Sequence, residues 1–202
     1  MLESSEVYYM QKIVSGSAAR GLLDLDVSPS ENIQRLALVL GKPVSEVCVA
    51  VINKPRNAEL IAEVQASGAK WVRFDEGDIA MAVAAATPNT GVDLLLGVGG
   101  SPEGVVTACA VQVLGGFMQT RFAPETPEQI SRALAANYDL ERKFELEELA
   151  SGTKFIFVLT AITDGLLADG VRVDGDDLVV QSFILDSELG VGHTVEVRIP
   201  RD

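Results

Sequence analysis

The feature that most constrains the fold is an alternation of short apolar segments with longer helical patterns between residues 47 and 116. The apolar segments VCVAVIN, KWVRF and VDLLLGV have the length and composition of buried strands. Each is followed by a segment with helical spacing, namely NAELIAEVQASG, DIAMAVAAA and PEGVVTACAVQVLGG. Strands that alternate with helices of this length favour a mostly parallel sheet flanked by helices and joined by right-handed crossovers.

Capping signals predict two further helical segments, one on each side of this alternation. Ser28 precedes a proline and has Glu31 three residues later, which is the pattern of a capped helix start. Thr126 and Gln129 repeat the pattern later in the chain. The dense charges of residues 139–148 follow, and we interpret them as the solvated face of a helix.

The last quarter of the chain changes to period-two alternation. The segments FIFVLTAITDG, VRVDGDDLVVQSFIL and TVEVRI read as strands, and Asp174 with Gly175 marks a hairpin turn. We therefore predict an α/β fold with a mostly parallel sheet, flanking helices and C-terminal antiparallel strands. No linker or repeat divides the sequence, so residues 1–202 are expected to form a single domain.

Composition excludes several classes of function. A net charge of −13 repels phosphate-rich surfaces, so neither a nucleic acid nor an anionic membrane is expected as a partner. No apolar run reaches the ~18 residues of a membrane helix, and we expect a cytoplasmic protein. Cys48 and Cys109 lie in apolar stretches and predict core thiols rather than a disulfide. His193 has no nucleophile motif beside it and reads as a surface residue.

Polar clusters follow the three predicted strands at the points where the strands end. Because the carboxyl ends of parallel strands meet at one edge of a sheet, these clusters should converge there. A lysine and an arginine at a strand end suit a phosphate or another anion, although a pair of surface ion pairs is an equally good explanation of these two residues alone. The clusters are Lys54 with Arg56, then Glu76, Gly77 and Asp78, then the glycine turn of residues 97–103.

The glycine turn combines an anion site with an unexpected carboxylate. Backbone N–H groups at a helix start bind anions, but Pro102 stands where a dinucleotide fingerprint starting at Gly97 requires glycine. Glu103 in the first helical turn would repel a phosphate unless a cation lay between them. A divalent metal that bridges Glu103 and a phosphate is the simplest explanation.

Five segments of this sequence, in order from about residue 8 to residue 168, resemble the class II fructose-1,6-bisphosphatases. The segments are YMQKIVSG, INKPRNAELIAEVQASGA, DEGDIAMAV, VDLLLGVGGSPEGVVTACAVQVLGGFMQTR and LTAITDGLL. The family includes forms that also accept sedoheptulose-1,7-bisphosphate. The resemblance implies metal-dependent hydrolysis of the 1-phosphate, a layered sugar-phosphatase fold of which this chain is the C-terminal part, and homo-oligomers.

Carried over to this sequence, the resemblance assigns one metal ligand and a set of substrate contacts. Glu103 becomes a ligand of a divalent ion, Mg or Mn. Glu76 stands where the family typically has aspartate, and Asn57 replaces a common histidine, which leaves the preferred sugar open. The implied contacts to the phosphorylated sugar are Tyr9, Lys54, Pro55, Arg56, Glu76, Gly77, Asp78 and Gly100.

One block of the family is absent from the sequence. Family members carry a D-P-[IL]-[ED]-G-T segment that supplies most metal ligands, whereas no aspartate precedes a proline here. Three hypotheses follow: a phosphatase half that needs a separate N-terminal half, a non-catalytic phosphosugar-binding module, and a structural relic. We expect the chain alone to be inactive, and to form a homo-oligomer or a tight complex with a separate N-terminal half.

Overall fold

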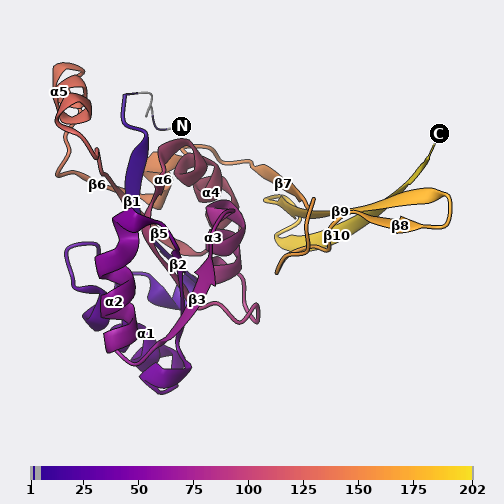
Figure 1. The fold of residues 1–202 in the computed structure, drawn as a ribbon, viewed down its shortest axis with the longest axis horizontal. Helices are drawn as coiled ribbons and strands as arrows, with labels where there is room; N and C mark the ends of the chain where they lie inside the picture. The colour runs from indigo at the N-terminus through magenta and orange to yellow at the C-terminus, as the bar shows by residue number, and fades with distance from the viewer. Residues whose placement is uncertain (1, 3–5, 202) are drawn as a thin grey trace.

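The computed structural model describes residues 2 and 6–201, which form a layered body and a narrow arm (Figure 1). The body is built on a six-stranded sheet and the arm on a four-stranded one. The described N-terminal segment enters the body directly, whereas the chain leaves along the arm, which carries the C-terminus away from the body (Figure 1).

The body sheet has the strand order β3-β2-β4-β1-β5-β6. Strands β3, β2 and β4 are parallel, and β1, β5 and β6 continue the sheet with antiparallel pairings. The parallel part is therefore the region that the alternation of strands and helices predicts. The strands span Tyr9–Ser15 (β1), Cys48–Ile52 (β2), Lys70–Phe74 (β3), Leu94–Gly100 (β4), Phe117–Phe122 (β5) and Lys143–Glu145 (β6).

Helices cover both faces of this sheet, and the strands bury side chains on each face. Val49 and Val51 of β2 pack on one side with residues of α1 and α2. Ala50 and Ile52 pack on the other side with residues of α3 and α4. The α-helices span Pro29–Leu40 (α1), Ala58–Ala66 (α2), Asp78–Ala86 (α3), Ser101–Val113 (α4), Pro127–Ala135 (α5) and Leu146–Leu149 (α6), and short 3-10 turns lie at Ser17–Ala19 (η1), Val44–Glu46 (η2) and Pro55–Asn57 (η3).

The predicted capping signals set the helix ends. The Ser28 side chain accepts a hydrogen bond from the Glu31 N–H, and Gly41 ends α1 in the left-handed conformation at φ 66°. Thr126 accepts in the same way from the Gln129 N–H at the start of α5. Both predicted helices are confirmed.

The charged run of residues 139–148 is not a helix face, and the prediction of one is wrong. The run comprises a turn, strand β6 and the short helix α6. Its Lys143 is paired with residues elsewhere in the fold, because Lys143 Nζ donates to Asp24 Oδ1 at 2.6 Å and pairs with Asp26 Oδ2 at 2.7 Å. These contacts hold β6 at the edge of the sheet, where no local pattern could place it.

The arm is an antiparallel sheet formed by the end of the chain. Its strands are Ile156–Thr160 (β7), Arg172–Asp174 (β8), Asp177–Asp186 (β9) and Val191–Pro200 (β10). Phe183 and Leu185 of β9 pack with Phe157 of β7 against Val83 of α3 and Ala110 of α4, which joins the base of the arm to the body. His193 lies exposed on β10, in agreement with the prediction of a surface residue.

The predicted α/β class, with flanking helices and C-terminal antiparallel strands, is confirmed. Cys48 and Cys109 are free thiols, and both are only partly buried, whereas the sequence predicts core positions. None of the helices in residues 2 and 6–201 has both the length and the apolar character needed to cross a bilayer.

Candidate active site

The carboxyl ends of β2, β3 and β4 open into a cavity of about 490 Å³. Three chain segments that lie far apart in the sequence meet there, which is the convergence that the strand-end clusters predict. Tyr8 and Tyr9, at the start of the antiparallel β1, close a fourth side. The lining residues are Tyr8, Tyr9, Ile52, Lys54, Arg56, Glu76, Gly77, Asp78, Ile79, Gly99, Gly100 and Glu103.

The two cations of the cavity are held differently. The Arg56 Nε–H donates to the Val98 carbonyl at 2.8 Å, and the guanidinium lies 4.3 Å from the centre of the Tyr9 ring. Among the residues that the structure describes, no carboxylate pairs with Arg56. Lys54 Nζ lies 2.6 Å from Glu76 Oε1, but Glu76 is 84% exposed, so this pair is weak. Arg56 is therefore the cation that is preoriented and still available to an anion.

Asp78 is anchored from behind the cavity by a buried lysine. Lys12 of β1 is only 3% exposed at its side chain, and its Nζ donates to Asp78 Oδ2 at 2.7 Å. Burial lowers the pKa of Lys12, and the adjacent Asp78 carboxylate opposes this shift. A Cβ at Gly99 would lie 2.4 Å from Asp78 Oδ2, so glycine at this position makes room for the pair.

Glu103 projects from the first turn of α4 back over the glycine turn. Its Oε2 atom is buried and makes no hydrogen bond within the described part of the chain. A Cβ at Gly100 would lie 1.9 Å from this oxygen, so the glycine allows the carboxylate to fold over the backbone. A buried carboxylate oxygen without a donor is costly, and a cation is the partner that satisfies it.

The residues present fit only part of a divalent metal site. Glu103 offers one hard oxygen ligand, which suits Mg²⁺ or Mn²⁺. In residues 2 and 6–201, no group of three or more His, Cys, Asp or Glu side chains is arranged to hold a metal ion. The neighbouring carboxylate of Asp78 is already engaged by Lys12.

Asn57 holds the strand ends around the cavity. The β2–β4 ladder pairs only Val49 with Leu94 and Ala50 with Leu95, so the two strands separate toward the cavity. The buried Asn57 amide bridges the gap: its Nδ2 donates to the Val98 carbonyl at 3.2 Å, and its Oδ1 accepts from the Val98 N–H at 2.8 Å. Asn57 therefore replaces the missing part of the ladder.

We expect Asn57→Ala to lower the free energy of unfolding by about 2 kcal/mol, because it leaves the partly buried Val98 N–H without an acceptor. Urea denaturation measures the change. Asn53→Ala is the matched control, since its amide donates to Asp75 at an exposed site, and a loss below about 0.5 kcal/mol is expected there. Equal losses in both variants would contradict the bridging role of Asn57.

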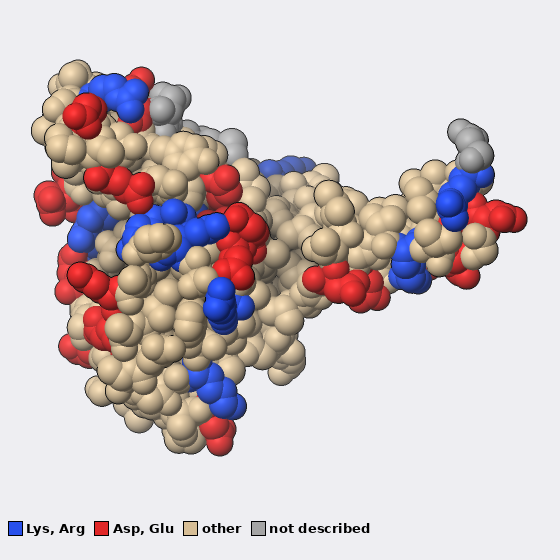
Figure 2. All heavy atoms as spheres, viewed as in Figure 1, with Lys and Arg blue, Asp and Glu red and all other residues tan. Residues whose placement is uncertain are grey.

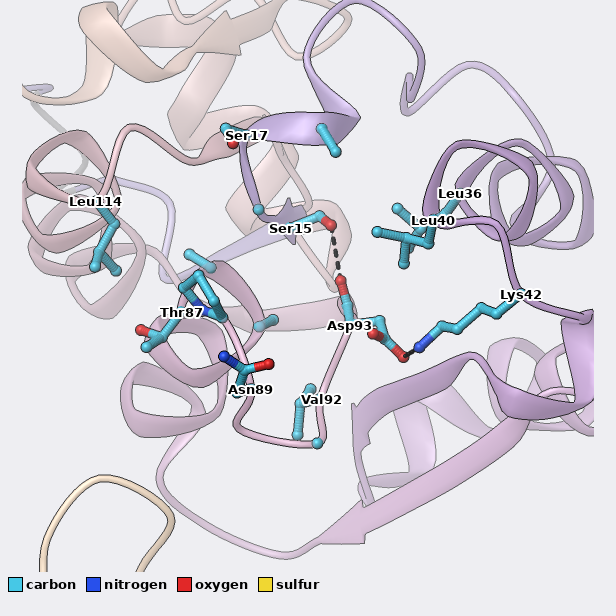
Figure 3. A pocket seen from close by; sticks show the side chains of 16 residues that line it. Ser15, Ser17, Leu36, Leu40, Lys42, Thr87, Asn89, Val92, Asp93 and Leu114 are labelled. Atoms are coloured by element: carbon cyan, nitrogen blue, oxygen red, sulfur yellow. Dashed lines mark hydrogen bonds and ion pairs between the residues drawn. The ribbon is translucent and has the colours of Figure 1, made fainter.

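A second cavity of about 490 Å³ lies at the opposite end of the sheet (Figure 3). Asp93 is its central charged group, and this carboxylate already accepts from Lys42 Nζ at 2.6 Å and from the Cys48 N–H at 2.7 Å. The side chains labelled in Figure 3 include Leu36, Leu40 and Leu114 but no cation other than Lys42. This cavity therefore lacks a charged group that is available to a phosphate.

The structure brings together the residues that the sequence singles out, with one exception. Pro55 does not line the cavity; it begins η3 and fixes the backbone between Lys54 and Arg56. Sequence reasoning missed Tyr8, Lys12 and the apolar side chains of Ile52 and Ile79. The available signal for Lys12 was that it is the single charged residue of a strand, YMQKIVS, whose neighbours Met10, Ile13 and Val14 are apolar.

Known proteins identify the family of this chain. A family model described as "Bacterial fructose-1,6-bisphosphatase, glpX-encoded" matches residues 1–198. The chain is 36% identical over 190 residues to a Haemophilus influenzae protein named fructose-1,6-bisphosphatase class 2. It is also 33% identical over 208 residues to Prochlorococcus marinus proteins from strains MIT 9301 and MIT 9215, each named D-fructose 1,6-bisphosphatase class 2/sedoheptulose 1,7-bisphosphatase.

These matches cover most of this chain but only part of each relative. The alignments take in 88% of this chain and 57% of the Haemophilus protein, and 95% of this chain and 62% of each Prochlorococcus protein. The chain therefore spans about three-fifths of the length of the relatives that it matches. The resemblance to class II fructose-1,6-bisphosphatases is confirmed, and the chain belongs to the glpX-encoded bacterial fructose-1,6-bisphosphatase family.

Proposed function

We propose that this chain is the phosphosugar-binding part of a class II sugar-bisphosphate phosphatase, which hydrolyses the 1-phosphate of fructose-1,6-bisphosphate or sedoheptulose-1,7-bisphosphate. The observation that carries the proposal is a cavity in which the Arg56 guanidinium has no carboxylate partner and the Glu103 carboxylate has no donor, among the described residues. An anion and a cation together satisfy both groups, and a phosphate with a divalent metal is such a pair.

The roles follow from the contacts in the cavity. Arg56 binds a phosphate through its free N–H groups, while the Tyr9 ring and the Val98 carbonyl fix its orientation. Lys54 adds a second positive charge when it exchanges the exposed Glu76 for the phosphate. Asp78, anchored by Lys12, and the backbone at Gly77 and Gly100 contact the sugar. Pro55 sets the direction of Lys54 and Arg56.

Glu103 supplies one ligand to a divalent ion, Mg or Mn. When bound, such an ion polarises the phosphoryl oxygen and lowers the pKa of a water. Two-metal hydrolysis needs several oxygen ligands, and the chain offers one free carboxylate at this position. We propose that the other ligands come from an N-terminal half outside this chain, a view that the partial coverage of the relatives supports.

A second candidate is a non-catalytic module that binds a sugar phosphate and regulates another protein. It is favoured by the contrast between a complete set of anion contacts and a metal site with one ligand. Both candidates require phosphosugar binding, whereas a structural relic does not. The expected cytoplasmic location, the single domain and the homo-oligomer stay predictions.

We expect Arg56→Ala to weaken binding of fructose-1,6-bisphosphate by about 10- to 150-fold, which is ~1.5–3 kcal/mol, the range for hydrogen bonds to a charged group. Titration calorimetry on the purified chain measures the change. Arg73→Ala is the matched control, because Arg73 pairs with Asp75 at an exposed site outside the cavity, and its affinity should stay within about twofold of wild type. No binding by any of the three proteins would favour the relic, and equal affinities for all three would contradict the role of Arg56 in binding.

A further inference from the structure

Strand β10 is a free edge of the arm. In the sheet order β10-β9-β7, β10 pairs with β9 alone, while the other side of β9 is taken by β7 and β8. The arm projects from the body, so its outer edge is not covered by the described helices (Figure 1). An uncovered edge presents a row of backbone N–H and C=O groups that another strand can pair with.

Two observations fix which backbone groups of β10 face outward. The Arg201 N–H donates to the Asp176 carbonyl at 2.8 Å, so Arg201 points its backbone toward β9. Because the direction alternates along an antiparallel strand, Arg198, Glu196 and Thr194 point their N–H and C=O groups away from β9. Pro200 falls in the same set, and a proline is tolerated where its nitrogen faces away from the sheet.

The sequence of this edge has a particular symmetry. Around Val197, the segment V-E-V-R-I reads aliphatic, acidic, aliphatic, basic, aliphatic. Val195, Val197 and Ile199 share one face of the strand and are 37%, 49% and 47% exposed. Reversing the segment exchanges the two charges and leaves the aliphatic positions in place. A two-fold interface needs this kind of self-complementarity, since each patch meets its own copy.

We propose that β10 pairs edge to edge with β10 of a second copy of this chain, antiparallel about a two-fold axis at Val197. In this register Glu196 lies opposite Arg198 of the second copy, with two backbone hydrogen bonds at each such pair. Val195 lies opposite Ile199 of the second copy, and Val197 lies opposite itself. The Thr194 N–H donates to the Pro200 carbonyl of the second copy, which is the only backbone hydrogen-bonding group that a proline has.

The charges select this register over its neighbours. A residue whose backbone groups face away from β9 can pair only with a residue of the same kind in the second copy. The two-fold axis must therefore pass through a residue of the strand and not between two residues. An axis at Glu196 places two glutamates opposite each other, and an axis at Arg198 places two arginines opposite each other, which is destabilising. An axis at Val195 leaves Arg198 opposite Gly192, and an axis at Ile199 places Arg198 opposite Pro200. The Val197 axis alone pairs both charges.

Disulfide trapping tests the register. The directly opposed, non-hydrogen-bonded pair at Val197 brings Cα atoms to about 4.5 Å, within the range of a disulfide. In a background that lacks Cys48 and Cys109, we expect Val197→Cys to form a disulfide dimer on mild oxidation. Val195→Cys is the matched control on the same face, and we expect it to form no disulfide alone but to cross-link when mixed with Ile199→Cys.

The outcomes separate the proposal from its competitors. A disulfide-linked dimer of Val195→Cys alone would place the axis elsewhere and overturn the register. A chain that stays monomeric at the highest protein concentration that sedimentation equilibrium allows, with no cross-link at Val197→Cys, would overturn the pairing itself. A noncovalent dimer without either cross-link would show that another surface associates, and would equally overturn it.

A charge exchange gives an independent measurement. Sedimentation equilibrium should show that Glu196→Arg weakens the dimer about tenfold, because each of two symmetric pairs becomes like-charged. The double variant Glu196→Arg/Arg198→Glu should restore wild-type association. Within one chain, Glu196 pairs with Arg172 and Arg198 with Asp174, both at 2.7 Å, and the double variant makes both of these pairs repulsive. Recovery of the association can therefore come only from the contact between the two β10 strands. A double variant that associates more weakly than the single variant would contradict the proposed pairing.

Discussion

The purified chain is expected to release phosphate from fructose-1,6-bisphosphate no faster than buffer, with Mg²⁺ or Mn²⁺ present. Enzymes of this kind accelerate the reaction by at least about 10⁶-fold, so the difference from an active enzyme is unmistakable. The reason lies in the ligand count: Glu103 carries a free buried carboxylate oxygen, and the described residues hold no cluster of three metal-binding side chains. A phosphate-release assay under metal titration measures the rate.

Adding the missing ligands should restore the activity. Co-expression with the part of the Haemophilus relative that lies outside its alignment with this chain supplies the candidate half. We expect metal-dependent phosphate release from the complex, abolished by Glu103→Gln because one metal ligand is lost. Arg73→Ala in the same complex is the control, and it should keep full activity because Arg73 pairs only with the exposed Asp75.

Two results would contradict this account. Robust metal-dependent hydrolysis by the pure chain, lost in Glu103→Ala, would mean that the chain contains metal ligands that its described residues do not reveal. Tight binding of fructose-1,6-bisphosphate without activity in any complex would favour the non-catalytic module. Calorimetry with Arg56→Ala separates this second result from a structural relic, which binds nothing.

Local signals were sufficient where one short segment determines an element. Strand KWVRF and helix DIAMAVAAA have the bounds that the sequence predicts, because the turn at Gly77, with φ 84°, separates them sharply. The meeting of Lys54, Asp78 and Glu103 at one cavity was also predictable, since parallel strands deliver their carboxyl ends to one edge.

Long-range contacts could not be predicted in the same way. Strand β1 lies between β4 and β5, and pairs with both antiparallel, although these strands come more than 70 residues later in the sequence. Strand β6 pairs with β5, and its Lys143 contacts Asp24, which lies 119 residues earlier in the sequence. The hydrophobic periodicity of a sequence carries no information on contacts between distant residues, so the predicted helix face at residues 139–148 was wrong. Lys12 was missed for the same reason, because its partner Asp78 is 66 residues away.

Lys12→Met is expected to lower the free energy of unfolding by about 3 kcal/mol, the low end for breaking a buried ion pair. For a chain of this size the melting temperature should fall by about 6–12 °C. Lys12 and Asp78 are 3% and 14% exposed at their side chains, so little water replaces the lost ammonium. Lys42→Met is the matched control: its partner Asp93 keeps the Cys48 N–H as a donor and is more exposed, so the loss should stay near 1 kcal/mol.

The double variant Lys12→Met/Asp78→Leu decides between an ion-pair effect and a packing effect. If the cost of the single change is an uncompensated carboxylate, removing that carboxylate should recover most of the stability, because two apolar side chains replace a desolvated pair. If the Lys12 stem matters only by filling space, the two losses should add. The double variant, even with its stability recovered, should bind fructose-1,6-bisphosphate more weakly than wild type, because Asp78 lines the cavity. Additive losses in denaturant unfolding would show that Lys12 does not hold Asp78 through its charge.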